Sequence, residues 1–273
     1  MSYLTYKHLN LHYSVTGTGD VLVFLHGFLE EKGMWKEIIG SFEKTHCVIC
    51  LDLLGHGKTE NLGYIHTMED QAKMLKFLLD ELGIRKCTLI GHSMGGYIAL
   101  AFADLYRDYV SGLCLMNSTA LADSAEKKIN RDRGIAAVKH NHKTFIRIAI
   151  PSLFSEENRS VFSDEIEEIT QETLHMSQQG IIASIEGMKI RSDRTHLLEQ
   201  HDFPVLMIIG KKDPALDYNS LLEQAKSKHV QSVVFEDGHM SHIENKNELI
   251  AALFIMPEMP RDLQGSSSIL KPY

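Results

Sequence analysis

Long hydrophobic runs are absent from this sequence of 273 residues. No uninterrupted apolar stretch reaches the roughly 18 residues that a membrane-spanning helix needs. The amino terminus alternates polar and apolar side chains and has no apolar signal-peptide core, so it predicts the first two strands of the fold. We therefore expect no membrane partner and a cytoplasmic location.

Cysteine is scarce as well. The sequence has four cysteines, and each lies in or beside an apolar run, where a free cysteine behaves as a small hydrophobe. Cys47 and Cys50 form a C-x-x-C pair, but residues three apart on a strand point to opposite faces. The second pair that a zinc site would need is missing, so we predict no metal site. The other two cysteines are Cys87 and Cys114.

Basic side chains are fewer than acidic ones, and the formal net charge is -8. Nucleic-acid binding depends on Lys and Arg that neutralise phosphates, and these residues are dispersed here, so we predict no nucleic-acid partner. The glycine pattern of a dinucleotide site is also incomplete. The stretch "TGTGD" at residues 16–20 lacks the third glycine and the following helix, and it predicts a hairpin turn and no cofactor.

What is present is an alternation of strand-like and helix-like segments. The continuous apolar runs are typical of a mainly parallel sheet that is covered on both faces by helices, which is an α/β fold. One of the helical patterns covers residues 67–82, begins at a Thr and ends before Gly83. The apolar runs cover residues 21–27, 46–52, 87–93, 110–117, 204–210 and 230–237.

The region from about residue 120 to 200 contains amphipathic helical segments and no convincing strand. Such a length exceeds an ordinary connection, and an insertion at the carboxyl edge of a parallel sheet covers the place where ligands bind. We therefore predict a core of residues 1–119 and 201–256, a helical cap of residues 120–200 that selects the substrate, and a disordered tail of residues 257–273. The alternative is that the cap's apolar stripes only pack against the sheet.

The stretch "GHSMG" places Ser93 between a strand-like and a helix-like run. It matches G-x-S-x-G, the turn that presents a nucleophilic serine above a sheet. A serine needs a neighbouring base and an acid that orients the base, in the chain order Ser, Asp, His. Asp213 and His239 follow the last two predicted strands in that order.

A second aspartate and a second histidine lie close to these two candidates in the sequence. Asp217 lies in the same loop as Asp213 but farther from the strand end, and His242 lies three residues after His239, which directly follows a glycine. We predict Asp213 as the acid and His239 as the base.

Two backbone N–H groups should stabilise the oxyanion of the reaction. We predict that they belong to Met94, directly after the serine, and to Phe28, in the "HGF" loop after a predicted strand. We assign structural roles to the remaining notable side chains near these loops: His26, His56, His92 and Trp35.

Taken together, these stretches resemble the α/β-hydrolase-fold superfamily over nearly the whole chain to about residue 256. The resemblance rests on "LHGFLEEKGMW", "DLLGHGKTE", "GHSMGGYIALAFA", "IIGKKDP" and "DGHMSHIE". It implies an eight-stranded, mostly parallel sheet whose second strand is antiparallel, helices on both faces and a helical cap. It also implies Ser93 as nucleophile, Asp213 as orienting acid and His239 as base.

The expected activity is hydrolysis of a small-molecule ester, as in a carboxylesterase. One alternative is a carbon–carbon bond hydrolase or a lyase like the menaquinone-pathway synthase of this superfamily, of which "LHGFL" is reminiscent. That synthase typically carries an arginine after the elbow glycines, where this chain has Tyr97, but the insertion holds several arginines. The other alternative is a binding protein that senses a small molecule. Whether the protein forms a homo-oligomer is left open.

Overall fold

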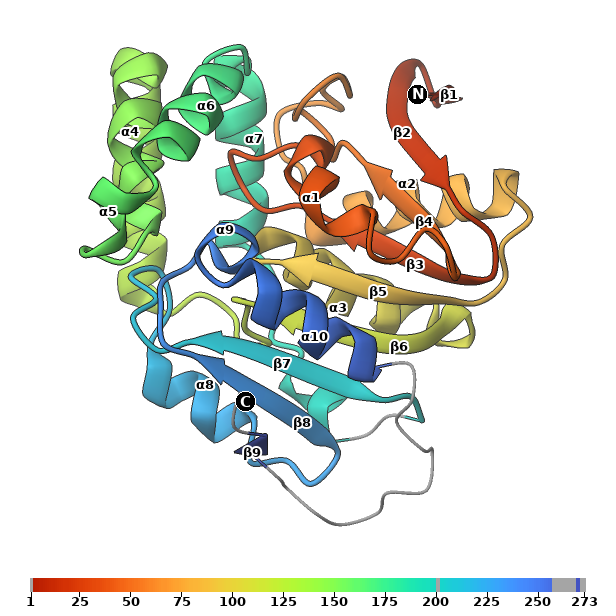
Figure 1. Ribbon diagram of the computed structural model, residues 1–273. Coiled ribbons are helices and arrows are strands. Elements are labelled where there is room, and N and C mark those ends of the chain that lie inside the picture. Colours follow the sequence, from red (N-terminus) through yellow and green to blue (C-terminus); the bar gives the residue numbers. More distant parts are fainter. Residues whose placement is uncertain (1, 200–201, 257–268, 271–273) are drawn as a thin grey trace.

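The computed structural model describes residues 2–199, 202–256 and 269–270 (Figure 1). Its centre is a sheet with the strand order β1-β2-β4-β3-β5-β6-β7-β8-β9. The strands are β1 Ser2–Tyr6, β2 Leu9–Thr16, β3 Asp20–Leu25, β4 His46–Leu51, β5 Cys87–His92, β6 Val110–Met116, β7 Val205–Gly210, β8 Val230–Phe235 and β9 Ile269–Leu270.

Strand β2 runs against both of its neighbours, β1 and β4, and the remaining pairs are parallel. Strands β1 to β8 therefore confirm the expected eight-stranded sheet with an antiparallel second strand. The predicted disordered tail lies outside the described residues except for residues 269–270, which form β9 and extend the sheet by pairing with β8.

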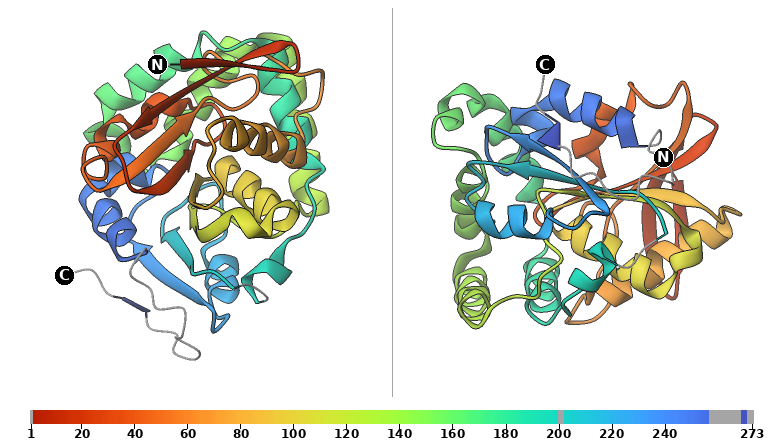
Figure 2. Two further views of the ribbon diagram at one scale, coloured as in Figure 1. Left: turned by 90° about the vertical axis from the view of Figure 1, so that its right-hand side faces the viewer. Right: turned by 90° about the horizontal axis from the view of Figure 1, so that it is seen from below.

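Helices cover both faces of the sheet, as Figure 2 shows in the view from below. Helices α1 (Lys36–Ile39) and α10 (Lys246–Ile255) cover one face, and α2 (Met68–Glu81), α3 (Met94–Leu105) and α8 (Tyr218–Gln224) cover the other. Every residue of β7 is buried because both of its faces are covered. The four cysteines are free, and Cys47 and Cys50 belong to the cores of opposite faces.

Helix α2 shows that local sequence signals determine where a helix begins and ends. Thr67 is its N-cap, and the Thr67 hydroxyl accepts a hydrogen bond from the Asp70 N–H at 3.0 Å. Glu69 and Asp70 lie in the first turn, where acidic side chains interact favourably with the helix dipole. The helix begins and ends within one residue of its predicted bounds.

The predicted hairpin at residues 16–20 is wrong. Strands β2 and β3 are not paired, because β4 lies between them in the sheet. The connection instead crosses the amino end of β4, and Gly17 and Gly19 have positive φ angles of 73° and 120°. A side chain on Gly17 would collide with the carbonyl oxygens of Glu43 and His46, so the glycines permit this close crossing.

The described residues 120–199 contain the α-helices α4 (Ala125–Ala149), α5 (Asn158–Val161), α6 (Ser163–Thr173) and α7 (Gln178–Lys189), besides two short 3-10 helices. They lie beyond the carboxyl ends of the strands (Figure 1), and α4 packs along α7. The Thr173 hydroxyl of α6 donates to the carbonyl oxygen of Leu29 at 2.8 Å, which ties these helices to the loop after β3. The remaining short helices are η1 Lys32–Trp35, η2 Arg107–Tyr109, η3 Pro151–Leu153, η4 Thr195–Leu198 and α9 Ser241–Glu244.

Within the described residues, no helix combines the length and the apolar character that crossing a membrane would require.

Candidate active site

Ser93 occupies a strained turn between β5 and α3. Its φ and ψ angles are 50° and -113°, outside the regions that residues with a side chain ordinarily adopt. The surrounding structure holds this turn, since the Ser93 N–H donates to Met116 at 2.9 Å and the Ser118 hydroxyl donates to the Ser93 carbonyl oxygen at 2.8 Å. Strain of this kind is maintained where function needs a side chain in an unusual position.

The glycines beside Ser93 are required by close packing. A side chain on Gly91 would collide with the backbone of Gly95, and a side chain on Gly95 would collide with the carbonyl oxygen of Leu25. The turn therefore brings α3 against both β5 and β3, which no residue with a Cβ would allow at these two positions.

Asp213 and His239 form a buried pair at the ends of β7 and β8. The His239 Nδ1–H donates to Asp213 Oδ2 at 2.7 Å, and the two residues are 3% and 8% exposed. Asp213 Oδ1 accepts the N–H groups of Ala215 at 2.8 Å and Leu216 at 3.1 Å. Burial raises the pKa of Asp213, but the charge of His239 and these hydrogen bonds outweigh it, so the pKa lies below its usual range.

Asn117 supports this pair and was not predicted from the sequence. Its Nδ2 donates to Asp213 Oδ2 and to the carbonyl oxygen of Gly238, each at 3.1 Å, and its Oδ1 accepts the Ser241 hydroxyl at 2.7 Å. Asn117 is fully buried and has a φ of 45°. The only signal in the sequence is an asparagine directly after an apolar strand, a position where an amide tolerates positive φ.

The two predicted oxyanion donors are both near the serine, since Met94 directly follows Ser93 and Phe28 lines the same cavity as Ser93. Met94 is the first residue of α3, and Phe28 lies in the loop after β3. Neither N–H has a hydrogen-bond acceptor in the described part of the chain. Leu29, the next residue, has a φ of 65°. The strained residues Leu29, Ser93 and Asn117 therefore follow three different strands at the same edge of the sheet.

Glu30 and His92 join the three loops of the site. Glu30 Oε2 accepts the Gly27 N–H and the His92 Nδ1–H, and the latter bond is 2.8 Å long. The second His92 nitrogen, Nε2, donates to the carbonyl oxygen of His239 at 2.9 Å. This network links the loop after β3, the Ser93 turn and the loop of His239, and sequence reasoning missed Glu30.

The hydrogen bonds of His92 fix its charge. Both partners of its ring are oxygen acceptors, so both nitrogens carry protons and the ring is an imidazolium. Burial would lower the pKa of His92, but the Glu30 carboxylate raises it overall. Burial likewise opposes ionisation of Glu30, but the charge of His92 lowers the pKa of Glu30 to about 2.

Glu30, His92 and His242 also bring potential metal-ligating atoms within 4.8 Å of one another. Both nitrogens of His92 are already hydrogen-bonded, and a metal ion would have to displace one of these bonds. The geometry therefore supports a buried ion pair between Glu30 and His92 more directly than a metal centre.

The other predicted residues have mainly structural contacts. Asp217 is the N-cap of α8, where it accepts the Ser220 N–H at 2.7 Å. His242 is buried in α9, and burial lowers its pKa to about 4. Trp35 is fully buried, with its ring 5.1 Å from that of Phe24.

His26 and His56 are fully buried and bond to the backbone of the surrounding loops. His26 Nδ1 donates to the Gly27 carbonyl oxygen at 2.7 Å, and His26 Nε2 accepts the Leu53 N–H at 2.9 Å. His56 Nδ1 donates to the Leu54 carbonyl oxygen at 3.0 Å. Both rings therefore hold loops of the site.

Ser93, His239 and Phe28 line one cavity of about 330 Å³, which we call the catalytic cavity. Its walls are mostly apolar and come from the core and from the helices of residues 120–200. The other lining residues are Leu29, Glu30, His92, Tyr97, Lys127, Asn130, Arg131, Gly134, Phe145, Ala149, Ser152, Leu153, Ile185, Met188, Ala215 and Leu216.

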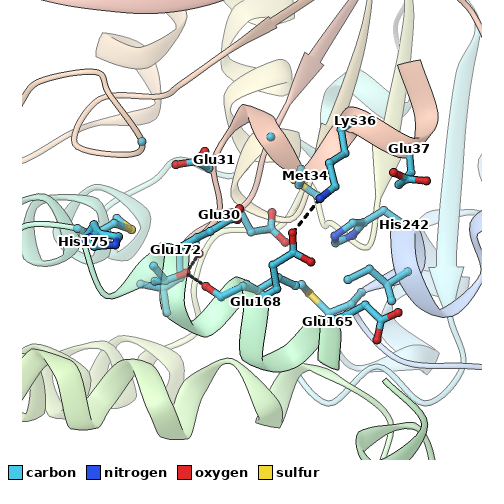
Figure 3. Close-up of a pocket in the computed structure, with 18 residues that line it drawn as sticks. Glu30, Glu31, Met34, Lys36, Glu37, Glu165, Glu168, Glu172, His175 and His242 are labelled. Carbon is cyan, nitrogen blue, oxygen red and sulfur yellow. Dashed lines mark hydrogen bonds and ion pairs between the residues drawn. The ribbon is translucent and has the colours of Figure 1, made fainter. Parts of the chain in front are cut away.

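A second cavity of about 140 Å³ shares Leu29 and Glu30 with the first but contains none of the three predicted triad residues. Figure 3 shows carboxylates and His242 around it, with Lys36 paired to Glu168 at 2.8 Å. We call it the acidic cavity, because its lining includes Glu30, Glu31, Glu37, Glu165, Glu168 and Glu172.

Comparisons with known proteins agree with this architecture. Residues 20–246 match the family model described as alpha/beta hydrolase fold. Over 254 residues the chain is 30% identical to a putative 2-succinyl-6-hydroxy-2,4-cyclohexadiene-1-carboxylate synthase of Bacillus subtilis (strain 168), with 86% of this chain and 90% of that protein covered.

Two solved structures are similar over nearly their whole length. A thermophilic esterase from Thermogutta terrifontis, in a malate-bound form, has a TM-score of 0.85 and 33% identity, with 90% of this chain and 92% of that chain covered. An enol-lactonase from Burkholderia xenovorans LB400 has a TM-score of 0.87 and 21% identity, with 94% and 100% covered. At that lower identity the likeness extends to the fold alone.

Proposed function

This chain belongs to the alpha/beta hydrolase fold family, and from that premise we propose that it is a serine hydrolase that cleaves small carboxylic esters. One observation carries the proposal. Ser93 occupies a strained strand-to-helix turn and lines the same cavity as His239. The Nδ1 of His239 is held by the buried carboxylate of Asp213. The esterase among the similar structures supports the choice of an ester.

In the proposed reaction, Ser93 Oγ attacks the ester carbonyl carbon while His239 Nε2 takes the serine proton. Asp213 holds the imidazole in the tautomer that carries its proton on Nδ1, and the hydrogen bond at 2.7 Å supports this role. The N–H groups of Phe28 and Met94 stabilise the oxyanion. His239 then protonates the leaving alcohol and activates the water that releases the acid.

The direct test is covalent labelling with a fluorophosphonate, followed by peptide mass spectrometry and ester kinetics. We expect the adduct on Ser93 and steady multiple turnover of p-nitrophenyl esters. Ser93→Ala should lose the label and about 10⁶ in kcat while it keeps its melting temperature. An adduct on another residue, or full esterase activity in Ser93→Ala, would overturn the assignment.

The similarity to the B. subtilis synthase supports a second candidate, carbon–carbon bond cleavage or elimination with the same three residues. A dienoate substrate assayed beside the ester series separates the two reactions. A higher kcat/KM for the dienoate than for every ester would favour the second candidate. A single slow turnover of all substrates would instead favour a binding protein that senses a small molecule.

A further inference from the structure

The catalytic cavity carries an excess of positive charge at its cap side. Lys127 and Arg131 lie four residues apart on α4, so both side chains lie on one face of the helix, and both line the cavity. The only acidic residue in the lining is Glu30, whose charge is balanced by His92. The cavity therefore has two cationic side chains that no lining carboxylate neutralises.

Arg131 is only partly engaged by its own protein. Its Nε donates to Asp123 Oδ2 at 3.0 Å, and its two terminal amino groups have no hydrogen-bond acceptor among the described residues. Asp123 is fully buried at its side chain and also accepts Arg191 Nη1 at 2.6 Å. One carboxylate is thus shared by two guanidinium groups, and a net positive charge remains beside the cavity.

Arg191 differs from Arg131 because its donors are engaged by the protein. It bonds to Asp123 and to the carbonyl oxygens of Leu121 and Met188, and its guanidinium lies 4.0 Å from the centre of the Tyr97 ring. This contact holds Tyr97 at the cavity wall. Arg131 is therefore the arginine with donors left for a ligand, in a fork that matches a carboxylate.

Lys127 lies opposite the loop that carries Asp213. Its Nζ donates to the carbonyl oxygen of Ala215 at 3.2 Å, and Ala215 also lines the cavity. A lysine ammonium has three donors, so this single bond leaves two for a ligand. Lys127 and Arg131 thus place unused cationic donors in the cavity that contains Ser93.

We propose that the substrate cleaved at Ser93 carries a carboxylate, which Lys127 and Arg131 bind at the cap side of the catalytic cavity. This inference rests on the function proposed above and specifies its substrate class. A carboxylate enters a largely apolar cavity only if charged donors replace its water, which these two side chains do. The carbon chain lies along the apolar walls, which include Phe145, Ile185 and Met188.

The test uses methyl esters of similar length whose far ends differ in charge: monomethyl adipate, its near-isosteric neutral carboxamide and methyl 6-aminohexanoate. The enzyme should show the highest kcat/KM for the anion and the lowest for the cation. Lys127→Gln and Arg131→Gln should each reduce the ratio of anionic to neutral kcat/KM by about tenfold to a hundredfold, the usual contribution of a charged hydrogen bond. Lys128→Gln and Arg133→Gln, on the same helix but outside the cavity lining, are matched controls that should keep the ratio.

A second pair of esters shows which half of the substrate carries the charge. 4-Butyryloxybenzoate and its neutral carboxamide place the charge on the alcohol side, whereas the adipate series places it on the acyl side. A preference for the anion in either pair that depends on Lys127 and Arg131 supports the proposal. Equal kcat/KM for anionic and neutral esters in both pairs, or a preference that survives both substitutions, overturns it while ester hydrolysis itself stands.

Calorimetry with the inactive variant Ser93→Ala measures ligand binding without turnover. It therefore tests the carboxylate site independently of the proposed reaction. The inactive variant should bind monomethyl adipate at least tenfold more tightly than the neutral carboxamide, and the added Arg131→Gln change should remove that difference. If the enzyme hydrolyses none of the esters, the proposed reaction fails, but preferential binding of the anion still supports the carboxylate site. Equal binding of both compounds overturns the carboxylate site whatever the reaction is.

Discussion

The two cavities of this protein share a wall but have opposite charge. Leu29 and Glu30 border both of them. Helix α4 contributes Lys127 and Arg131 to the catalytic cavity, whereas α6 contributes Glu165, Glu168 and Glu172 to the acidic cavity. An anionic molecule is therefore attracted to the first cavity and repelled from the second. The charged residues of α4 and α6 thus distinguish the two cavities.

The surroundings of the carboxylates also differ between the two cavities. Beside the catalytic cavity, Asp213 holds the lining residue His239 and accepts four hydrogen bonds, from His239, Asn117, Ala215 and Leu216. In the acidic cavity, burial and then the charge of Glu168 raise the pKa of Glu172. The first arrangement is preorganised for one ionised state of its acid, whereas the second contains carboxylates that repel one another.

Among the residues that support Ser93, the largest expected effect comes from Asp213. Asp213→Asn removes the charge that selects the His239 tautomer, and kcat should fall by about 10⁴. Asp217→Asn is the matched control, because Asp217 lies in the same loop but caps α8. Steady-state kinetics on one p-nitrophenyl ester compares the two variants. A larger loss in Asp217→Asn would reverse the assignment of the acid.

Substitution of Glu30, which borders both cavities, tests whether the wall between them contributes to catalysis. Glu30→Gln leaves the His92 imidazolium without its carboxylate partner and loosens the loop that contains Phe28. We expect kcat to fall by about tenfold to a hundredfold, as for a small displacement of catalytic groups, with KM changed less. Glu31→Gln is the control, since Glu31 borders only the acidic cavity. Unchanged kcat in Glu30→Gln would mean that the network only stabilises the fold.

Most of the fold was predictable because its elements follow local signals. The six apolar runs became β3 to β8 within two residues at each end, and the Thr67 cap fixed the start of α2. The hairpin at residues 16–20 was not predictable in the same way. Strand β2 pairs with β4, which lies about thirty residues farther along the chain. The sequence of the turn after β2 does not determine this long-range pairing.

In the site, too, residues in local motifs were predictable, whereas residues whose roles depend on long-range contacts were not. Ser93, Asp213 and His239 lie in recognisable loops, and the fold brings all three to one edge of the sheet. Asn117 and Glu30 have no motif, because their roles depend on hydrogen bonds to partners 96 and 62 residues away. Such roles become visible only when the loops are assembled in space.

Low pH can reduce the stability of the fold as well as the activity of the site. His66 allows the effect on stability to be measured by itself. It contacts α7 through its backbone, it lines neither cavity, and burial lowers its pKa to about 4. Because the folded pKa is lower than the unfolded one, the unfolded state binds more protons between about pH 6.5 and pH 4. The free energy of unfolding therefore falls as the pH is lowered through this window.

Chemical denaturation at pH 7 and pH 5 measures this loss. For one histidine with these values it amounts to about 2 kcal/mol. His66→Gln should reduce the loss by about that amount, and His140→Gln, at an exposed position of α4, should leave it unchanged. An identical loss in the wild type and in His66→Gln would show that other groups cause the acid sensitivity.

The smallest effect is expected from the acidic cavity. Glu168→Gln removes a carboxylate that is paired with Lys36 and lies outside the lining of the catalytic cavity. Both side chains of this pair are more than half exposed, so solvent screens their charges and the substitution should change melting temperature little. The ratio of anionic to neutral ester kcat/KM should change by less than about twofold, because the Glu168 carboxylate is paired with Lys36 and screened by solvent. Lys127→Gln, measured in the same assay, provides the contrast. If Glu168→Gln altered that ratio as strongly as Lys127→Gln does, the acidic cavity would have to form part of the path that the substrate follows to Ser93, and the two cavities would act as one site.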